Sequence, residues 1–162
     1  MKAVAFLLKD KQFFAKVDEG IRLVGNPIVV AKRMKENGVR LIHIEDADIK
    51  TMKNFDIYDK LTYIVNIEVE APCDEKIIRK LLEVKARVVV ELPCAELGKF
   101  EESKRLLVGK IKNWEDAEGI EFVNDVIVFS ESDIETAERL GKRVLFWGKT
   151  KKKVFAEIEG YV

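Results

Sequence analysis

The chain has 162 residues, of which 48% are hydrophobic, so it can bury a core and is expected to form one domain over residues 1–162. Lys plus Arg and Asp plus Glu both number 29, which gives no electrostatic basis for a nucleic-acid partner. No segment approaches the roughly 18 consecutive apolar residues of a membrane span, and the start of the chain lacks a signal peptide, so we expect no membrane partner and a cytoplasmic location.

Short apolar runs rich in branched residues predict the strands. In chain order they are Ala3–Leu8, Gln12–Val17, Arg40–Glu45, Leu61–Ile67, Arg87–Glu91, Arg105–Ile111, Asp125–Phe129, Arg143–Trp147 and Val154–Ile158. Most of these runs are continuously apolar rather than alternating. That pattern is typical of strands with helices on one face and a core on the other.

Helix signals separate the strands. A helix is expected over Pro27–Gly38, with Asn26 as its N-cap, and a second over Asp74–Val84 with a clear apolar face. A third is expected over Asp133–Leu140, where Ser132 begins a capping-box pattern. Shorter helices are predicted at Asn54–Lys60, Leu97–Ser103 and Trp114–Gly119.

Alternation of strands and helices predicts a parallel sheet with right-handed crossovers. Closing this sheet gives an α/β, TIM-like (β/α) barrel with seven or eight mainly parallel strands. Such barrels usually contain about 250 residues, so a barrel in this chain must be compact or incomplete. An open doubly wound sheet is the structural alternative.

The most distinctive stretch joins a Gly25-Asn26-Pro27 turn to the strand Ile42-His43-Ile44-Glu45-Asp46-Ala47-Asp48. It resembles the histidine-biosynthesis (β/α)8-barrel family, which contains the phosphoribosylformimino aminoimidazole carboxamide ribotide isomerase and its cyclase sister. Family members typically have a Gly-Asp-Pro turn, a helix and then a Leu-His-Val-Val-Asp-Leu-Asp strand. Asp74–Glu96 and residues 126–135 also resemble the family, whereas the part equivalent to its fifth and sixth units is much shorter. The resemblance implies a TIM barrel and descent from an isomerase.

The family's two acid–base aspartates have no counterpart at the matching positions. The first falls at Leu7, and Asp10, three residues later, is its candidate replacement. The second belongs to the fifth strand, where Leu107–Ile111 contains no carboxylate. Opening a ribose ring and shifting its protons needs two opposed proton-transfer groups, so the ancestral isomerase activity is not expected.

The family's phosphate-binding loops are also altered. Its Gly-Gly-Gly run after the third strand matches Asn66-Ile67-Glu68, its Gly-Thr matches Glu91-Leu92, and its last Gly-Gly matches Glu131-Ser132. Side chains replace bare backbone amides, and each loop gains an acid that repels anions. These changes argue against a substrate with two phosphate groups.

Several acids follow predicted strands and are expected to share one barrel mouth. They are Glu45, Asp46, Asp48, Glu68, Glu70 and Glu91. Asp46 and Asp48, with Asp10, are the candidate catalytic residues, and Lys110 or Lys149 is expected to hold an anionic group. The residues expected to contact a small anionic metabolite are Glu45, Asn66, Glu68, Glu91, Lys110, Ser130, Gly148 and Lys149.

The acids have two other interpretations. They can form structural ion pairs with Lys9, Arg87, Lys110 and Lys112, as charge-rich proteins often do. They can also hold a hard cation such as Mg²⁺ or Ca²⁺. The sequence leaves the metal question open, and it predicts no cofactor.

His43 and the two cysteines are ambiguous. His43 has the opposite strand parity to Asp46, so we expect it to face the helices as a satisfied buried residue. Cys73 and Cys94 could meet at the ends of adjacent strands; they are expected to be buried free thiols, with a reactive or metal-binding pair as the alternative. The basic run Lys149–Lys153 is either a solvated turn or a phosphate contact after the seventh barrel strand.

Three classes of function remain open. The chain is a divergent isomerase or lyase for a small phosphorylated or carboxylated metabolite, a non-catalytic metabolite-binding or regulatory protein, or a dimeric interaction protein. Incomplete helical cover would expose apolar surface, which predicts a homodimer. The charged fraction of 36% and a single glutamine, Gln12, favour a thermophilic source.

Overall fold

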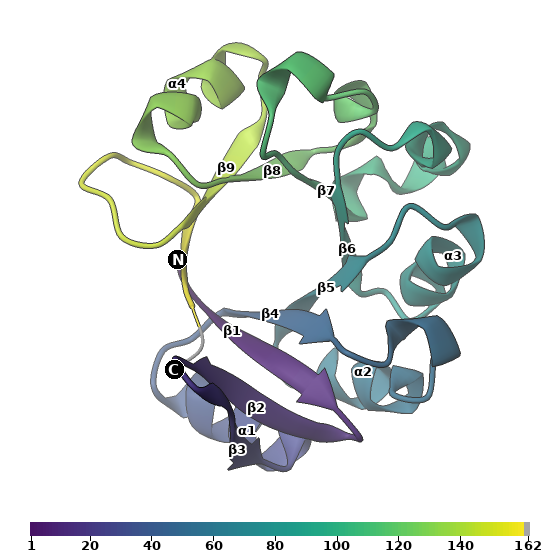
Figure 1. Cartoon of the computed structure of the whole chain (residues 1–162), viewed down its shortest axis with the longest axis vertical. Coiled ribbons are helices and arrows are strands. Elements are labelled where there is room, and N and C mark those ends of the chain that lie inside the picture. The colour runs from purple at the N-terminus through teal and green to yellow at the C-terminus, as the bar shows by residue number, and fades with distance from the viewer. Residues whose placement is uncertain (161–162) are drawn as a thin grey trace.

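Eight parallel strands close into a barrel in the computed structural model, which describes residues 1–160 (Figure 1). The strands are β1 (Lys2–Lys9), β4 (Leu41–Asp46), β5 (Asn66–Ala71), β6 (Arg87–Glu91), β7 (Leu107–Lys110), β8 (Asp125–Val128), β9 (Arg143–Trp147) and β10 (Ala156–Glu159). Each pairs with its neighbour in this order, and β10 pairs with β1 to complete the ring. The predicted TIM-like barrel is confirmed, and the closed ring excludes an open doubly wound sheet.

The chain makes so small a barrel because its outer helices are short. The α-helices are α1 (Pro27–Glu36), α2 (Phe55–Leu61), α3 (Glu75–Glu83) and α4 (Glu131–Arg139). The 3₁₀ helices are η1 (Ile49–Thr51), η2 (Ala95–Leu106), η3 (Trp114–Asp116) and η4 (Ile120–Phe122). Figure 1 shows them around the ring, and the loop between β9 and β10 has no helix. Within residues 1–160 no helix has the length and apolar character that a membrane crossing requires.

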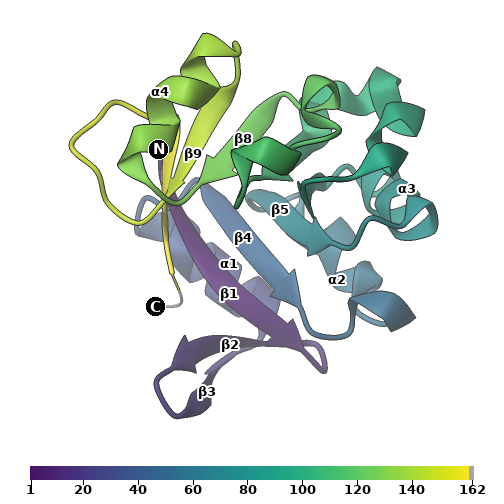
Figure 2. The ribbon, with the colours of Figure 1, turned by 45° about the horizontal axis from the view of Figure 1, so that its top comes forward.

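An antiparallel hairpin follows β1 and lies outside the ring (Figure 2). It consists of β2 (Gln12–Val17), which pairs with β1, and β3 (Gly20–Gly25), which forms the outer edge. The rings of Phe6 and Phe13 stack at 4.9 Å and join the hairpin to the barrel. The sequence predicted β2 but not β3, because the residues of β3 remain exposed or half-buried and show no buried pattern.

Local capping signals explain where two helices begin. The side chain of Asn26 accepts hydrogen bonds from the backbone of α1, including one of 2.9 Å from the amide of Ile28. Asp74 caps α3 in the same way by accepting from Ile77 at 3.2 Å. Both helices therefore begin as the sequence predicted.

Two other predicted boundaries are wrong. The run Leu61–Ile67 was expected to be a strand, but α2 continues to Leu61 and β5 begins at Asn66. Most of the apolar residues of this run belong to the end of α2 and to the turn that follows it, and they pack against the barrel. A buried strand gives the same run of apolar residues, so the two cannot be distinguished from sequence. Helix α4 begins at Glu131 after Ser130, so Ser132 is not the N-cap; its hydroxyl instead lies 2.9 Å from that of Ser130.

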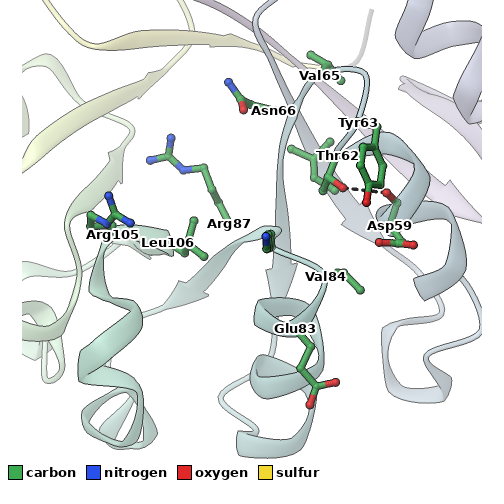
Figure 3. A pocket seen from close by; sticks show the side chains of 12 residues that line it. Asp59, Thr62, Tyr63, Val65, Asn66, Glu83, Val84, Arg87, Arg105 and Leu106 are labelled. Atoms are coloured by element: carbon green, nitrogen blue, oxygen red, sulfur yellow. Dashed lines mark hydrogen bonds between the residues drawn. The ribbon is translucent and has the colours of Figure 1, made fainter.

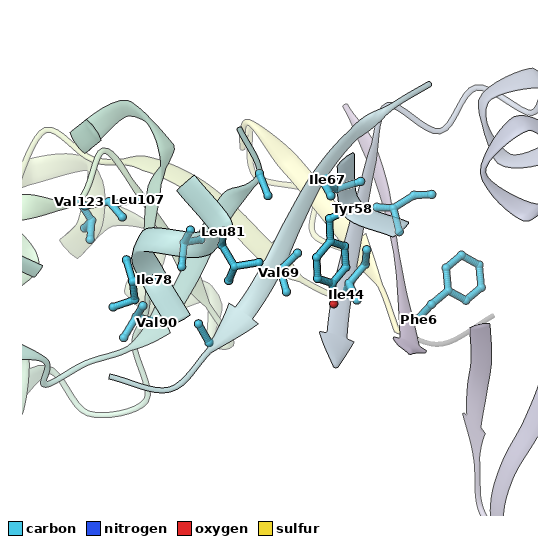
Figure 4. Close-up of a cluster of buried hydrophobic side chains, with 14 of the residues drawn as sticks. Phe6, Ile44, Tyr58, Ile67, Val69, Ile78, Leu81, Val90, Leu107 and Val123 are labelled. Carbon is cyan, nitrogen blue, oxygen red and sulfur yellow. The ribbon is translucent and has the colours of Figure 1, made fainter. Parts of the chain in front are cut away.

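The strands separate two cores. The outer core lies between strands and helices and includes Ile44, Tyr58, Val69 and Ile78 (Figure 4). The inner core is smaller and consists of Ala3, Ala5, Leu41, Val89, Val108, Ile127, Leu145, Ala156 and Ile158. Alternate residues of a strand face opposite sides of the sheet, so every second residue counted from an inner-core residue also faces the barrel interior. Many of these inward-facing residues are charged.

Candidate functional site

A row of charged side chains runs through the barrel interior. On β4, Leu41 belongs to the inner core, so His43 and Glu45, at the same parity, face inward. The expectation that His43 faces the helices is wrong, because it assumed that Asp46 faced the barrel. Asp46 instead shares the outward parity of Ile42 and Ile44, which belong to the outer core.

His43 is fully buried between two carboxylates. Its Nδ1 lies 2.7 Å from Oε1 of Glu68, and its Nε2 lies 2.8 Å from Oε2 of Glu70. Burial alone would lower the pKa of His43, but hydrogen bonds to both carboxylates and their negative charges raise that pKa to about 9. The imidazole is therefore a cation at neutral pH and donates a hydrogen bond to each glutamate.

Glu70 carries the row to the mouth of the barrel. Its second oxygen, Oε1, accepts a hydrogen bond of 2.8 Å from Nζ of Lys110, on β7. Burial alone would raise the pKa of Glu70, but hydrogen bonds and charge from His43 and Lys110 lower that pKa to about 2. The side chains of Glu70 and Lys110 are 22% and 16% exposed, so both reach solvent at the carboxyl ends of the strands.

Aromatic side chains form one wall of this mouth. The Trp147 ring meets the His43 ring edge-on at 5.2 Å and lies 6.0 Å from the Phe129 ring. Nζ of Lys110 lies 5.8 Å from the centre of the Phe129 ring, within reach of a weak cation–π contact. The mouth thus presents a carboxylate and an ammonium group beside apolar surface.

The row continues toward the amino-terminal end of the barrel. Glu68 is the cross-strand partner of Arg87, and Arg87 forms an ion pair with the fully buried Asp125. Arg143 donates to both oxygens of Asp125, at 2.8 and 2.9 Å, and stacks on the ring of Phe155 at 3.6 Å. The bidentate contact is a strong form of ion pair.

The charges alternate in sign along this row, which we call the charge row. From the amino-terminal end to the mouth it consists of Arg143, Asp125, Arg87, Glu68, His43, Glu70 and Lys110. Burying charges costs several kcal/mol for each ion before pairing, and apolar side chains would fill a barrel at less cost. The row is therefore a candidate for function rather than a simple device for stability.

The predicted ligand-binding residues divide between three places. Glu45 and Glu91 lie at the rim, where Lys16 Nζ is 2.5 Å from Glu45 Oε2 and Lys112 Nζ is 3.2 Å from Glu91 Oε1. Glu68 and Lys110 belong to the charge row. Asn66 begins β5 and so lies at the opposite end from the mouth, which corrects its expected match to a phosphate cradle.

The remaining predicted positions follow β8 and β9. Ser130 directly precedes α4, and Gly148 comes after β9 with a φ of 116°, a backbone conformation that favours glycine. Lys149 begins the basic loop, where the amide of Thr150 donates to Glu157 at 2.8 Å. These residues share the carboxyl-terminal end of the barrel with the mouth.

The three predicted catalytic aspartates form a separate cluster beside α2. Asp46 accepts hydrogen bonds from the Tyr58 hydroxyl at 2.5 Å and the Asn54 amide at 2.9 Å. Burial raises the pKa of Asp46, although these hydrogen bonds oppose the rise. Asp48 accepts from the backbone amide of Asp10 at 2.9 Å, a hydrogen bond that lowers the pKa of Asp48. Asp46 and Asp48 were expected to share the mouth with the other acids, but the parity of β4 turns Asp46 to the helix side, where Asn54 donates to both aspartates.

The cysteines form a disulfide, which corrects the expectation of free thiols. Cys73 and Cys94 follow β5 and β6, and their Cα atoms are 5.6 Å apart. The predicted approach of the two residues at neighbouring strand ends is confirmed. The disulfide joins the loops that come after Glu70 and Glu91, so it fixes that side of the mouth.

Two members of the charge row were missed from the sequence, because Asp125 and Arg143 were taken only as strand ends. Phe129, which lies beside Lys110 at the mouth, was not considered as a contact residue either. A signal was present, because charges recur at every second position in strands that are otherwise apolar, as in Glu68 and Glu70. No three His, Cys, Asp or Glu side chains in the described part of the chain are arranged to hold a metal ion.

Comparison of the sequence with models of known protein families gives no match, and no curated protein is detectably similar to the chain.

Proposed function

We propose that the barrel mouth binds a small carboxylated or phosphorylated metabolite. The observation that carries this proposal is the charge row. At the carboxyl end of the barrel, this row places the carboxylate of Glu70 next to the ammonium group of Lys110. Ligands of such barrels bind at this end in essentially every characterised enzyme of the fold.

The contacts define the ligand's chemistry. An ammonium group has three donors, and Lys110 uses one of them on Glu70, which leaves donors for an anionic group of the ligand. Glu70 has a pKa of about 2, so it is a carboxylate at neutral pH and accepts a hydrogen bond from a hydroxyl or ammonium group. Phe129 and Trp147 offer apolar contact to the rest of the molecule. The expected ligand is therefore a compact hydroxy acid, amino acid or related phosphate.

A panel of such acids, measured by thermal unfolding and calorimetry, tests this proposal. A ligand that binds only the folded chain stabilises it by about 2.7 kcal/mol when present at 100 times its dissociation constant. Lys110→Met is expected to abolish this effect. Lys112→Met is the matched control, because Lys112 lies two residues further along and pairs with Glu91 at the exposed rim. Equal loss in both variants, or no response to any member of the panel, contradicts the proposal.

Proton transfer at this mouth, as in an isomerase or lyase, is the second candidate function. One observation favours it: Glu70, His43 and Glu68 form a hydrogen-bonded carboxylate–imidazole–carboxylate relay that ends at solvent. A carboxylate with a pKa of about 2 is a weak base in the free protein. A ligand anion that draws Lys110 away from Glu70 raises the basicity of Glu70, which makes the transfer depend on binding.

Hydrogen–deuterium exchange distinguishes catalysis from binding alone. An isomerase or lyase is expected to exchange a carbon-bound proton of its ligand with deuterated water, and Glu70→Gln should stop the exchange while part of the binding remains. Binding without exchange in the unmodified protein supports the non-catalytic function.

Descent from the histidine-biosynthesis barrels stays part of this proposal. It is supported by the Gly25-Asn26-Pro27 turn and the strand that ends at Asp46, together with the closed parallel ring. The ancestral mechanism is not proposed, because Leu7 and the residues of β7 supply no carboxylate at the family's acid–base positions.

A further inference from the structure

A cavity opens near the amino-terminal ends of β5 and β6, away from the mouth. Its volume is about 550 Å³, within the range of small-molecule sites. It is lined where β5 and β6 begin and where η2 ends, by residues that include Asn66, Arg87 and Arg105 (Figure 3). The proposed ligand at the mouth does not occupy this cavity, although Arg87 belongs both to the cavity lining and to the charge row.

The lining of the cavity is rich in cations. The lining contains three cations, Lys85, Arg87 and Arg105, and two acids, Asp59 and Glu83. Figure 3 shows the guanidinium groups of Arg87 and Arg105 at the left of the view, Asp59 at the right and Glu83 at the bottom. Glu83 also lies 3.5 Å from Lys80, which neutralises part of its charge.

Two of the three cations have no acid partner, and the third is incompletely satisfied. Neither Lys85 nor Arg105 forms an ion pair with any described residue of the chain. Arg87 pairs with Asp125, yet its buried Nε has no hydrogen-bond partner among residues 1–160. Its cross-strand neighbour Glu68 has a buried Oε2 that also lacks a hydrogen-bond partner, so Arg87 is held between two acids, and Lys85 and Arg105 are the cavity's cations without an acid partner among residues 1–160.

The backbone at Lys85 has a left-handed conformation. Lys85 follows α3 with a φ of 61°, and its amide donates to the carbonyl of Leu82 at 3.0 Å. This left-handed position after a helix is usually glycine, because other residues adopt it at a cost. Here the residue is a lysine, and Lys85 is one of the residues that line the cavity.

We propose that this amino-terminal cavity binds the phosphate group of a small phosphorylated molecule through Lys85, Arg87 and Arg105. Guanidinium groups match phosphate oxygens in a planar, bidentate geometry, and a lysine adds a point charge. Asn66 and Thr62 line the same cavity and offer neutral hydrogen-bonding groups. Catalysis in this fold belongs to the carboxyl-terminal end, so the cavity is a binding site separate from the mouth.

Inorganic phosphate is the probe for the test, followed by amide chemical shifts in NMR spectra at constant ionic strength. We expect a dissociation constant on the order of 1 mM, as for a small fragment, with the shifts centred on residues 62–66, 83–87 and 105–106. Chloride is expected to cause no such shifts, and acetate only weaker ones. Acetate that binds as tightly as phosphate would overturn the assignment to phosphate.

Two variants each remove one of the two cations that have no acid partner, without threatening the fold. Lys85→Gly deletes the ammonium group and places glycine where the backbone favours it, so stability is expected to hold or rise. Arg105→Gln removes an unpaired guanidinium group. Each should weaken phosphate binding by at least about tenfold. Arg139→Gln is the matched control, because Arg139 is exposed on α4, far from the cavity lining, and pairs with Glu135.

A variant at the mouth separates this inference from the proposed function. Lys110→Met should leave phosphate binding in the cavity unchanged. If phosphate binding is lost in Lys110→Met but kept in Lys85→Gly and Arg105→Gln, phosphate binds at the mouth and the inference is overturned. Absence of any phosphate-dependent shift up to about 20 mM also overturns it, and neither result bears on whether hydroxy acids or amino acids bind at the mouth.

Discussion

Titration of His43 tests the charge row most directly. His43 is the only histidine of the chain, so its ring gives a single NMR signal, and it is fully buried between Glu68 and Glu70. We expect its imidazole to lose its proton only near a pKa of about 9, whereas an unperturbed histidine has a pKa of 6.5.

The raised pKa makes the stability of the fold depend on pH. Below pH 6.5 the imidazole is protonated in both the folded and the unfolded chain, and its full stabilising contribution is present. As the pH rises above 6.5 the unfolded chain loses the proton first, so the contribution decreases and is gone once the pH has passed about 9. The difference between the two pKa values corresponds to about 3 kcal/mol of unfolding free energy.

Chemical denaturation at a series of pH values between about 6 and 9.5 measures this loss, with the ring signal followed in parallel. Glu68→Gln is the isosteric control: it removes one carboxylate partner, so the pKa of His43 should fall and the loss of stability should shrink. A constant free energy of unfolding over this range, with a ring that titrates near 6.5, would refute the reasoning.

Reducing the disulfide between Cys73 and Cys94, which are 21 residues apart, should lower the free energy of unfolding by about 3 kcal/mol, measured by denaturation with and without a reductant. Asp46→Asn should cost about 1–3 kcal/mol, because Asp46 accepts three hydrogen bonds, yet it should leave ligand affinity at the mouth unchanged in calorimetry. A large loss of affinity would restore Asp46 as a site residue. The predicted homodimer should form through the open edge of β3, where Leu23 is 59% exposed. Sedimentation equilibrium should then give twice the 18.6 kDa chain mass, and Leu23→Lys should give a monomer; a monomer without the substitution contradicts this.

The sequence was sufficient for the architecture because apolar runs and helix caps are local signals. The runs that became β1, β4, β6, β8 and β9 were each located to within about two residues. The strand that became β5 was misplaced, because Leu61 and its apolar neighbours belong to the end of α2 and the following turn, which pack against the barrel. An apolar run of this length does not distinguish a buried helix end from a strand.

The candidate site was harder to predict, because it depends on which side of each strand a residue faces. An error of one position in parity exchanges the inside and outside of a barrel. Because Asp46 was assumed to face inward, His43 was predicted to face outward. The same assumption placed the expected catalytic acid Asp46 on the wrong side of β4. The position of Leu41 in the inner core shows which residues of β4 face inward, but this position is known only from the structure.

The alternating signs inside the barrel also constrain how this chain can diverge. Replacing His43, Glu68 or Asp125, which are fully buried, leaves neighbouring charges without a counterpart in a dry environment, whereas exchanging two adjacent members together preserves neutrality. Related sequences are therefore expected to show paired substitutions at these positions, in which an acid and its basic neighbour are both replaced by aliphatic residues. Single substitutions therefore rarely remove the interior charges. A ligand preference that depends on these charges is expected to persist after selection for it has ended.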